Sequence, residues 1–190
     1  MPEECARRDS SQVDLAMKLA ESCKPIELIL SDVDGVLTDG SVMFDNQGIE
    51  VKTFHVRDGM GIKLWQRGGH QFGLLTGRTS QIVRLRAAEL GIDIVRQGIA
   101  EKLPTALEIV ADLGLDIRQV CYIGDDLPDV TLLQAAGLGV AVADADAEVR
   151  RTADHTTRAA GGRGAVRETV ELILKNQHRW DDLVQRYFTA

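Results

Sequence analysis

The sequence predicts an α/β fold, a doubly wound parallel sheet with helices on both faces. Apolar runs of strand length alternate with helical patterns over roughly 120 residues, which is typical of βαβ units. Three of the apolar runs end directly in acidic or hydroxyl side chains. Open parallel sheets bind their ligands beyond the carboxyl ends of the strands. The pattern therefore predicts both the sheet and the edge at which it acts.

An N-terminal extension precedes this sheet. Residues 13–23 place apolar side chains at helical spacing and stand just before Pro25, so they predict an amphipathic helix that ends there. The length of 190 residues fits a single domain with a short appendage. We expect the extension to occupy residues 1–24 and the main domain residues 25–190.

The main domain opens with the apolar run Leu28–Leu30, which suits a buried strand. Two β-prone runs separated by Asn46, Gln47 and Gly48 then predict a hairpin over residues 41–56. Helices are predicted at 58–67, 79–90, 101–113, 127–136 and from about 165 to 187, and strands at 71–76, 92–97, 119–124 and 138–143.

Composition limits the partners. The 29 acidic and 22 basic residues give a net charge of −7, which argues against nonspecific binding to nucleic acid or to an anionic membrane. The three cysteines are widely spaced and lack the close pairs of zinc sites, which favours reduced thiols. No secretory signal or membrane span is recognised in the sequence. We expect a cytoplasmic protein.

The polar clusters at the strand ends are rich in carboxylates. They comprise Asp32 with Asp34, then Thr76–Arg78, and then Asp125 with Asp126. Four carboxylates at one edge would repel each other strongly without a cation among them. Because no cysteine or histidine accompanies them, a hard ion such as Mg²⁺ is favoured, and Mg²⁺ commonly binds phosphate as well. The site is therefore predicted to perform phosphate chemistry.

Phosphoryl transfer needs a nucleophile, a proton donor and groups that neutralise the phosphate oxygens. Asp32 can attack phosphorus and form an aspartyl phosphate. Asp34 can protonate the leaving oxygen and then activate water. Thr76 and the amide of Gly77 can donate to phosphate, and Lys102 is the predicted lysine that balances the remaining charge.

These residues carry a family resemblance. The segments "DVDGVLTDG", "LLTGR", Lys102 and "YIGDDLPD" resemble the four ordered motifs of the haloacid dehalogenase (HAD) superfamily over roughly residues 26–158. The segments "DGVLTDGSVMFDNQG", "FHVRDGMGIKLW" and "AGGRGAVRE" are similar to the phosphatases that act on 3-deoxy-D-manno-octulosonate 8-phosphate (KDO 8-phosphate) and to their close relatives that act on nine-carbon 2-keto sugar acid phosphates. The resemblance implies an HAD-like, Rossmann-like core and a Mg²⁺-dependent phosphate monoester hydrolase with an aspartyl-phosphate intermediate.

The same resemblance implies residue roles. The metal would be held by the carboxylate of Asp32, the backbone carbonyl of Asp34 and the carboxylate of Asp125. Asp126 and Asp129 would be supporting residues. For Asp129, a carboxylate that only stabilises a helix start is an equal alternative.

Substrate contacts are less constrained by the sequence. Residues 35–75 and 77–101 leave no room for a cap domain, so another element must cover the site. Arg57, Lys63, Arg78 and Arg163 are predicted to contact a sugar acid, although each is also compatible with an ordinary surface charge. The resemblance implies a homotetramer, and we expect residues 161–167 to reach a neighbouring subunit. The glycine-rich turn there also suits a purely structural reversal of the chain.

Three alternative functions remain. A phosphatase for a nine-carbon 2-keto sugar acid 9-phosphate would share every motif around phosphorus. A receiver-like signalling module also uses acidic residues, a hydroxyl and a lysine on a parallel sheet, but there the acidic pair comes first and the phosphorylated aspartate later. A noncatalytic binding subunit would be expected to lack Asp32 or Asp34, and both are present.

Overall fold

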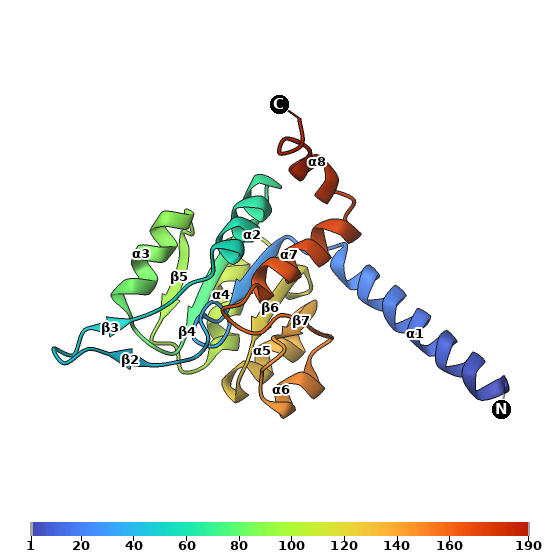
Figure 1. Cartoon of the computed structure of the whole chain (residues 1–190), viewed down its shortest axis with the longest axis horizontal. Coiled ribbons are helices and arrows are strands. Elements are labelled where there is room, and N and C mark those ends of the chain that lie inside the picture. Colours follow the sequence, from blue (N-terminus) through green and yellow to red (C-terminus); the bar gives the residue numbers. More distant parts are fainter. Residues whose placement is uncertain (1, 190) are drawn as a thin grey trace.

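The protein is built on one six-stranded parallel sheet (Figure 1). The structure, a computed structural model, describes residues 2–189, with side chains described from residue 13 onward. The strand order is β5-β4-β1-β6-β7-β8, and every pairing in this sheet is parallel. The strands are β1 (Leu28–Ser31), β4 (Gln71–Thr76), β5 (Ile94–Gln97), β6 (Val120–Gly124), β7 (Leu138–Ala141) and β8 (His155–Thr156). The predicted doubly wound parallel sheet is confirmed.

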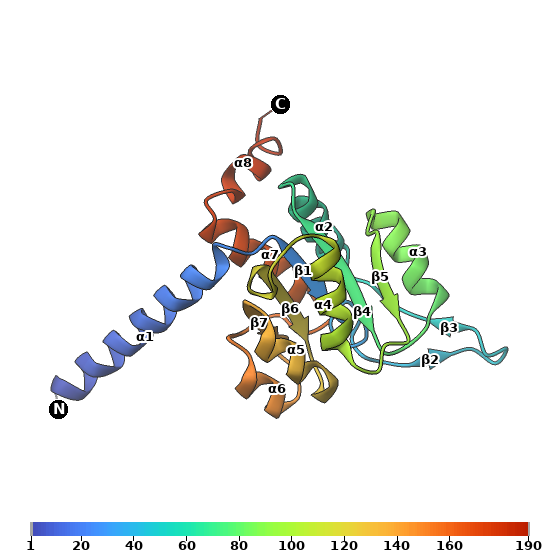
Figure 2. The same ribbon diagram turned by 180° about the vertical axis from the view of Figure 1, so that it is seen from behind.

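Helices cover both faces of the sheet. In Figure 1, α2 (Val56–Arg67) and α7 (Ala165–Asn176) lie on the near face, and they pack against each other. The view from behind in Figure 2 brings α4 (Lys102–Asp112) and α5 (Val130–Ala135) to the front. The remaining helices are α1 (Pro2–Cys23), α3 (Gln81–Leu90), α6 (Ala147–Thr152) and α8 (Trp180–Gln185), with short 3₁₀ turns η1 (Ile117–Gln119) and η2 (Leu127–Asp129).

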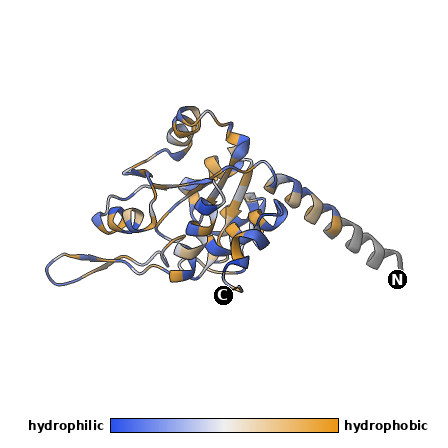
Figure 3. Cartoon of the chain, turned by 90° about the horizontal axis from the view of Figure 1, so that it is seen from above, coloured by the Kyte–Doolittle hydropathy of each residue, from blue (hydrophilic) through white to orange (hydrophobic). Residues whose placement is uncertain are grey.

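The central strand explains why the core forms where it does. All four residues of β1 are buried, and β1 pairs with both β4 and β6. A strand covered on both faces needs a continuous apolar run, and Leu28–Leu30 supplies it. Hydrophobic residues accordingly concentrate on the strands at the middle of the body (Figure 3).

The predicted hairpin is present, and it stands apart from the main sheet. It consists of β2 (Met43–Phe44) and β3 (Glu50–Val51), which form a separate antiparallel pair. Gly48 adopts φ 78° in its turn, a conformation that favours glycine. Five apolar side chains of this hairpin are exposed: Val42, Met43, Phe44, Ile49 and Val51.

Three details differ from the sequence prediction. The long terminal helix is divided into α7 and α8, because His178 takes φ 58° and so interrupts the helical geometry. The predicted helix 127–136 begins as the 3₁₀ turn η2. The short elements α6 and β8 were not predicted, since neither has a distinctive hydrophobic period.

Helix α1 ends at Cys23, before Pro25 as expected, and projects from the body (Figures 1 and 2). Within residues 2–189, none of the helices combines the length and apolar character that crossing a membrane requires.

Candidate active site

The loop after β1 places Asp32 and Asp34 at the carboxyl edge of the central strand. Gly35 turns this loop with φ 94°. The hydroxyl oxygen of Thr38 accepts hydrogen bonds from the amides of Gly35 and Gly40, at 3.3 Å each. A Cβ atom at residue 35 would lie 2.0 Å from Asp125 Oδ2, so only glycine lets the loop approach β6 this closely.

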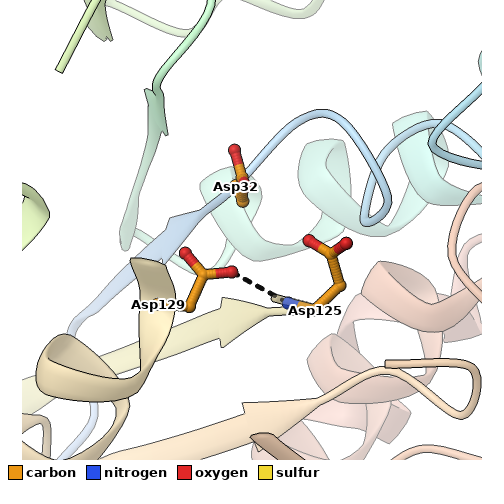
Figure 4. A group of neighbouring side chains, drawn as sticks. All are labelled: Asp32, Asp125 and Asp129. Carbon is orange, nitrogen blue, oxygen red and sulfur yellow. Dashed lines mark hydrogen bonds between the residues drawn. The ribbon is translucent and has the colours of Figure 1, made fainter. Parts of the chain in front are cut away.

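Three aspartates from β1 and β6 converge beyond these strands (Figure 4). One carboxylate oxygen from each of Asp32, Asp125 and Asp129 lies within 4.8 Å of the other two. The approach follows from the topology, because β1 and β6 are parallel neighbours whose ends coincide. Asp32 and Asp125 thus meet as predicted from the sequence, but the third carboxylate of the cluster is Asp129, which was predicted only as a supporting residue.

Asp129 is already saturated with hydrogen bonds. Its Oδ2 accepts from the backbone amides of Asp125 (2.9 Å) and Asp126 (3.2 Å). Its Oδ1 accepts from the Tyr122 hydroxyl and from Lys102 Nζ, each at 2.5 Å. Four donors leave this buried carboxylate little capacity for a metal. Asp129 instead holds the loop after β6 and fixes Lys102.

Lys102 joins this anchor to the predicted nucleophile. Its side chain is 3% exposed, and its Nζ lies 2.8 Å from Asp32 Oδ2. Burial raises the pKa of Asp32 to about 6, although Lys102 lowers it. Burial disfavours the charge of Lys102, but Asp32 and Asp129 outweigh burial and raise the lysine pKa. The ammonium therefore stays charged beside Asp32, the predicted nucleophile, whose carboxylate would have to be ionised to attack phosphorus.

Asp125 has the environment of a cation ligand. Burial and the neighbouring carboxylates of Asp32 and Asp129 raise its pKa to about 8. Its Oδ1 is buried and has no hydrogen-bond partner among the described residues. A buried oxygen without a partner is costly, and a bound cation would satisfy it. Since the donors are all oxygens, Asp32, Asp125 and the carbonyl of Asp34 fit a hard divalent ion such as Mg²⁺.

Asp34 is surrounded by cations that belong to other elements. Lys52 of the hairpin region forms an ion pair with Asp34 Oδ1, and Arg78 Nε lies 3.9 Å from Asp34 Oδ2. Lys52 was not predicted from the sequence, because a lysine in a strand-like segment with mixed polarity resembles a surface charge. Tyr122 was not predicted either, since its position in an apolar strand gives no indication that its hydroxyl contacts Asp129.

A cavity of about 490 Å³ unites most of the predicted residues. Its lining includes eight of them: Asp32, Asp34, Thr76, Gly77, Arg78, Lys102, Asp125 and Asp126. Thr76 ends β4, the strand beside β1, which is why its hydroxyl reaches the same edge. The Asp126 side chain, however, accepts a hydrogen bond from the amide of Leu127 at 2.8 Å and caps η2.

Three predicted substrate contacts lie elsewhere on the chain. Arg57 and Arg163 line a second surface hollow of about 470 Å³, together with Arg158 and Arg167. Lys63 Nζ donates to the backbone carbonyl of Glu89 at 3.1 Å. Within one chain, Arg78 is the only one of the four predicted sugar-acid contacts that lines the cavity of the aspartates.

The glycine-rich turn packs against the loop after β1 of its own chain. The amide of Gly162 donates to Val36 O at 2.8 Å, and the amide of Gly161 donates to Asp144 Oδ1 at 2.8 Å. A Cβ atom at residue 161 would lie 1.7 Å from Gly35 O. The absence of side chains at these two glycines therefore lets the turn pack directly on the loop that carries Asp34.

Comparisons with known proteins agree with this geometry. Residues 87–167 match the model of the haloacid dehalogenase-like hydrolase family. The chain is 40% identical over 159 residues to the 3-deoxy-D-manno-octulosonate 8-phosphate phosphatase KdsC of Haemophilus influenzae, which covers 84% of this chain and 88% of that protein. It is 43% identical over 157 residues to KdsC of Escherichia coli K12, covering 83% and 84% of the two chains.

Solved structures show the same likeness. The phosphatase of this kind from Moraxella catarrhalis, in complex with magnesium, phosphate and KDO, superposes with a TM-score of 0.87 at 38% identity, covering 89% of this chain and 97% of that one. A cobalt-bound enzyme from Haemophilus influenzae gives a TM-score of 0.83 at 39% identity, covering 88% and 99%. A probable phosphatase from Pseudomonas syringae gives 0.90 at 43% identity, covering 92% and 99%.

Proposed function

The chain belongs to the family of 3-deoxy-D-manno-octulosonate 8-phosphate phosphatases within the haloacid dehalogenase-like hydrolases, and from that membership we propose that it hydrolyses KDO 8-phosphate to KDO and inorganic phosphate. It is a phosphoric monoester hydrolase. The observation that supports the proposal best is the cavity in which Asp32, Asp34 and Lys102 meet Thr76 at the carboxyl edge of the sheet.

The first half-reaction uses the two aspartates of the loop after β1. A carboxylate oxygen of Asp32 attacks phosphorus, and the bond between phosphorus and the sugar oxygen breaks. Asp34 gives its proton to that departing oxygen, so that the sugar leaves as an alcohol. The Thr76 hydroxyl and the Gly77 amide donate hydrogen bonds to the remaining phosphate oxygens, and Lys102 neutralises part of their charge.

The second half-reaction regenerates the enzyme. Water attacks the phosphorus of the aspartyl phosphate while Asp34 takes one of its protons. The bond between phosphorus and the Asp32 oxygen breaks, and inorganic phosphate leaves. Asp129 positions Lys102 throughout, because its own carboxylate is fixed by Tyr122 and two backbone amides. Mg²⁺, when bound by Asp32, Asp125 and the Asp34 carbonyl, supplies positive charge that polarises the phosphoryl group.

The assembly is part of the proposal. The exposed apolar side chains of the hairpin need a cover, since exposed strand edges of this kind pair with other chains. A homotetramer built on the hairpin would provide that cover. Arg57, Lys63 and Arg163 lie outside the cavity of their own chain. In such an assembly they would contact the substrate in the cavity of a neighbouring subunit. We further assign the chain to the cytoplasm, with residues 1–24 as an extension of the catalytic domain 25–190.

The test compares a panel of phosphate esters by kcat/KM. KDO 8-phosphate is expected to exceed hexose 6-phosphates and the nine-carbon 2-keto sugar acid 9-phosphates by at least about 10-fold, because only a matched carboxylate position lets an arginine bind it in a bidentate manner. Asp32→Asn should lower kcat by several orders of magnitude on every ester. Equal rates across the panel would refute the substrate, and near-normal turnover by Asp32→Asn would refute the nucleophile.

The assembly is tested separately. Sedimentation equilibrium is expected to give four chains per particle. Arg163→Ala should raise KM for KDO 8-phosphate and leave p-nitrophenyl phosphate, which has no carboxylate, unchanged. Arg151→Ala is the matched control, because Arg151 lies on α6 and pairs with Glu148. A fully active monomer would contradict the proposed assembly.

A further inference from the structure

A buried lysine contacts the proposed acid/base residue. Lys52 follows β3 in the hairpin, and only 1% of its side chain is exposed. Its Nζ pairs with Asp34 Oδ1 and lies 3.3 Å from Glu50 Oε1. Among the described residues Asp34 lines the cavity, whereas Lys52 does not. The lysine therefore contacts the carboxylate from outside the cavity.

The two oxygens of Asp34 differ in their surroundings. Oδ1 is held by Lys52, whereas Oδ2 is buried and has no hydrogen-bond partner within the part of the chain that the structure describes. The nearest guanidinium atom, Arg78 Nε, is 3.9 Å from Oδ2, which exceeds hydrogen-bonding distance. Oδ2 is thus the oxygen of Asp34 to which none of the described residues donates a hydrogen bond, and it is available to a group bound in the cavity.

Residues that follow strand β4 hold Lys52 in place through its partner Glu50. Its partner Glu50 accepts a hydrogen bond from the Ser80 hydroxyl at 2.5 Å and one from Arg78 Nη2 at 3.2 Å. Both donors follow Thr76 in the chain, on the loop between β4 and α3. Glu50 thus links the hairpin to the loop between β4 and α3, and Lys52 links it to the loop that carries Asp34.

We propose that Lys52 is a positioning residue for the acid/base step: it pins Asp34 Oδ1 and leaves Oδ2 as the oxygen that meets the departing sugar oxygen. This inference rests on the proposed phosphatase function and assigns a role that no motif of the sequence indicated. Acid catalysis requires the proton donor to lie within hydrogen-bonding distance of the leaving oxygen. A carboxylate free to rotate would spend much of its time out of that geometry.

Two esters with different leaving groups distinguish a positioning role of Lys52 from a purely structural one. The sugar leaves as an alkoxide unless it is protonated, whereas p-nitrophenolate is a weak base that leaves without help. Lys52→Met is therefore expected to lower kcat/KM by about 10- to 100-fold on KDO 8-phosphate and by less than about 3-fold on p-nitrophenyl phosphate. Lys52→Arg, which keeps the charge, should lose less, and again only on the sugar ester. Lys175→Met is the control, since Lys175 is exposed and pairs with Glu171 on α7.

A double-mutant cycle shows whether Lys52 acts through Asp34. In an Asp34→Asn background, the added Lys52→Met change should lower kcat/KM on the sugar ester no further. Equal losses on both esters, or a full further loss in the Asp34→Asn background, would overturn the inference. Thermal unfolding establishes that each variant is folded, and if Lys52→Met is not, Lys52→Arg carries the two-ester comparison.

Failure of the proposed substrate and failure of the proposed role of Lys52 give different experimental results. If the wild-type protein does not hydrolyse KDO 8-phosphate, the proposed substrate is wrong, and Lys52 is tested on whichever alkyl phosphate the protein does hydrolyse. If the wild type is active on the sugar ester and Lys52→Met is equally active, only the role of Lys52 is wrong.

Discussion

Removing the charge of Lys102 is expected to destabilise the protein and to impair Asp32, the proposed nucleophile. Its Nζ lies 2.8 Å from Asp32 Oδ2 and 2.5 Å from Asp129 Oδ1, and the side chain is 3% exposed. Breaking a buried ion pair costs roughly 3–5 kcal/mol, because the remaining charge has no partner. Asp129 keeps Tyr122 and two amide donors, so we expect Lys102→Met to lower the free energy of unfolding by about 3 kcal/mol at pH 9.

The loss of stability caused by Lys102→Met should be larger at high pH than at low pH. Without metal, the folded pKa values of Asp32 and Asp125 are about 6 and about 8, both raised above their ordinary values. A carboxyl group with a raised folded pKa binds its proton more tightly in the folded state, so stability falls as pH rises through that pKa. Lys102 offsets this loss. The difference between wild type and Lys102→Met should therefore be larger at pH 9 than at pH 5, where Asp32 is protonated and only the contact with Asp129 remains.

Urea unfolding in EDTA at pH 5 and pH 9 measures both quantities. Lys175→Met is the control, because Lys175 is 54% exposed and its pair with Glu171 contributes at most about 1 kcal/mol. With Mg²⁺ present, turnover of p-nitrophenyl phosphate by Lys102→Met should fall by at least about 100-fold. A stability difference below about 1 kcal/mol, or one that is the same at both pH values, would refute this account of the cluster.

Two further predictions concern the metal site. Gly35→Ala would place a Cβ atom 2.0 Å from Asp125 Oδ2 at φ 94°, so it should weaken Mg²⁺ binding, measured by calorimetry, by about 10-fold or more. Gly48→Ala is the control, because Gly48 has φ 78° and open space around it, and it should bind Mg²⁺ normally. Equal affinities of the two variants would contradict the steric reasoning. Asp125→Asn should raise the melting temperature in EDTA at pH 9, because it removes a charge that burial and two carboxylates disfavour. It should also abolish the increase in melting temperature that Mg²⁺ gives the wild type. If Mg²⁺ still raises the melting temperature of Asp125→Asn, Asp125 is not a metal ligand.

The order of most elements, and the edge of the sheet at which acidic side chains gather, were predictable from the sequence. Apolar runs such as Leu28–Leu30 have no stable alternative to burial, so their periodicity predicted the strands of a parallel sheet. Because all these strands point the same way, the aspartates that follow β1 and β6 had to meet at one edge. Fold class and acidic cluster were therefore both predictable from local patterns.

How each charge is paired could not be read from the sequence. Lys52 and Asp34 are 18 residues apart, and Tyr122 reaches Asp129 across the start of the loop after β6, yet neither partnership leaves a local signal. The same applies to Arg57 and Arg163, whose place outside the cavity follows from the packing of α2 against α7. Periodicity reports which side of an element is buried. The partner of a buried polar group depends on which distant element packs there, and that is fixed only when the whole chain has folded.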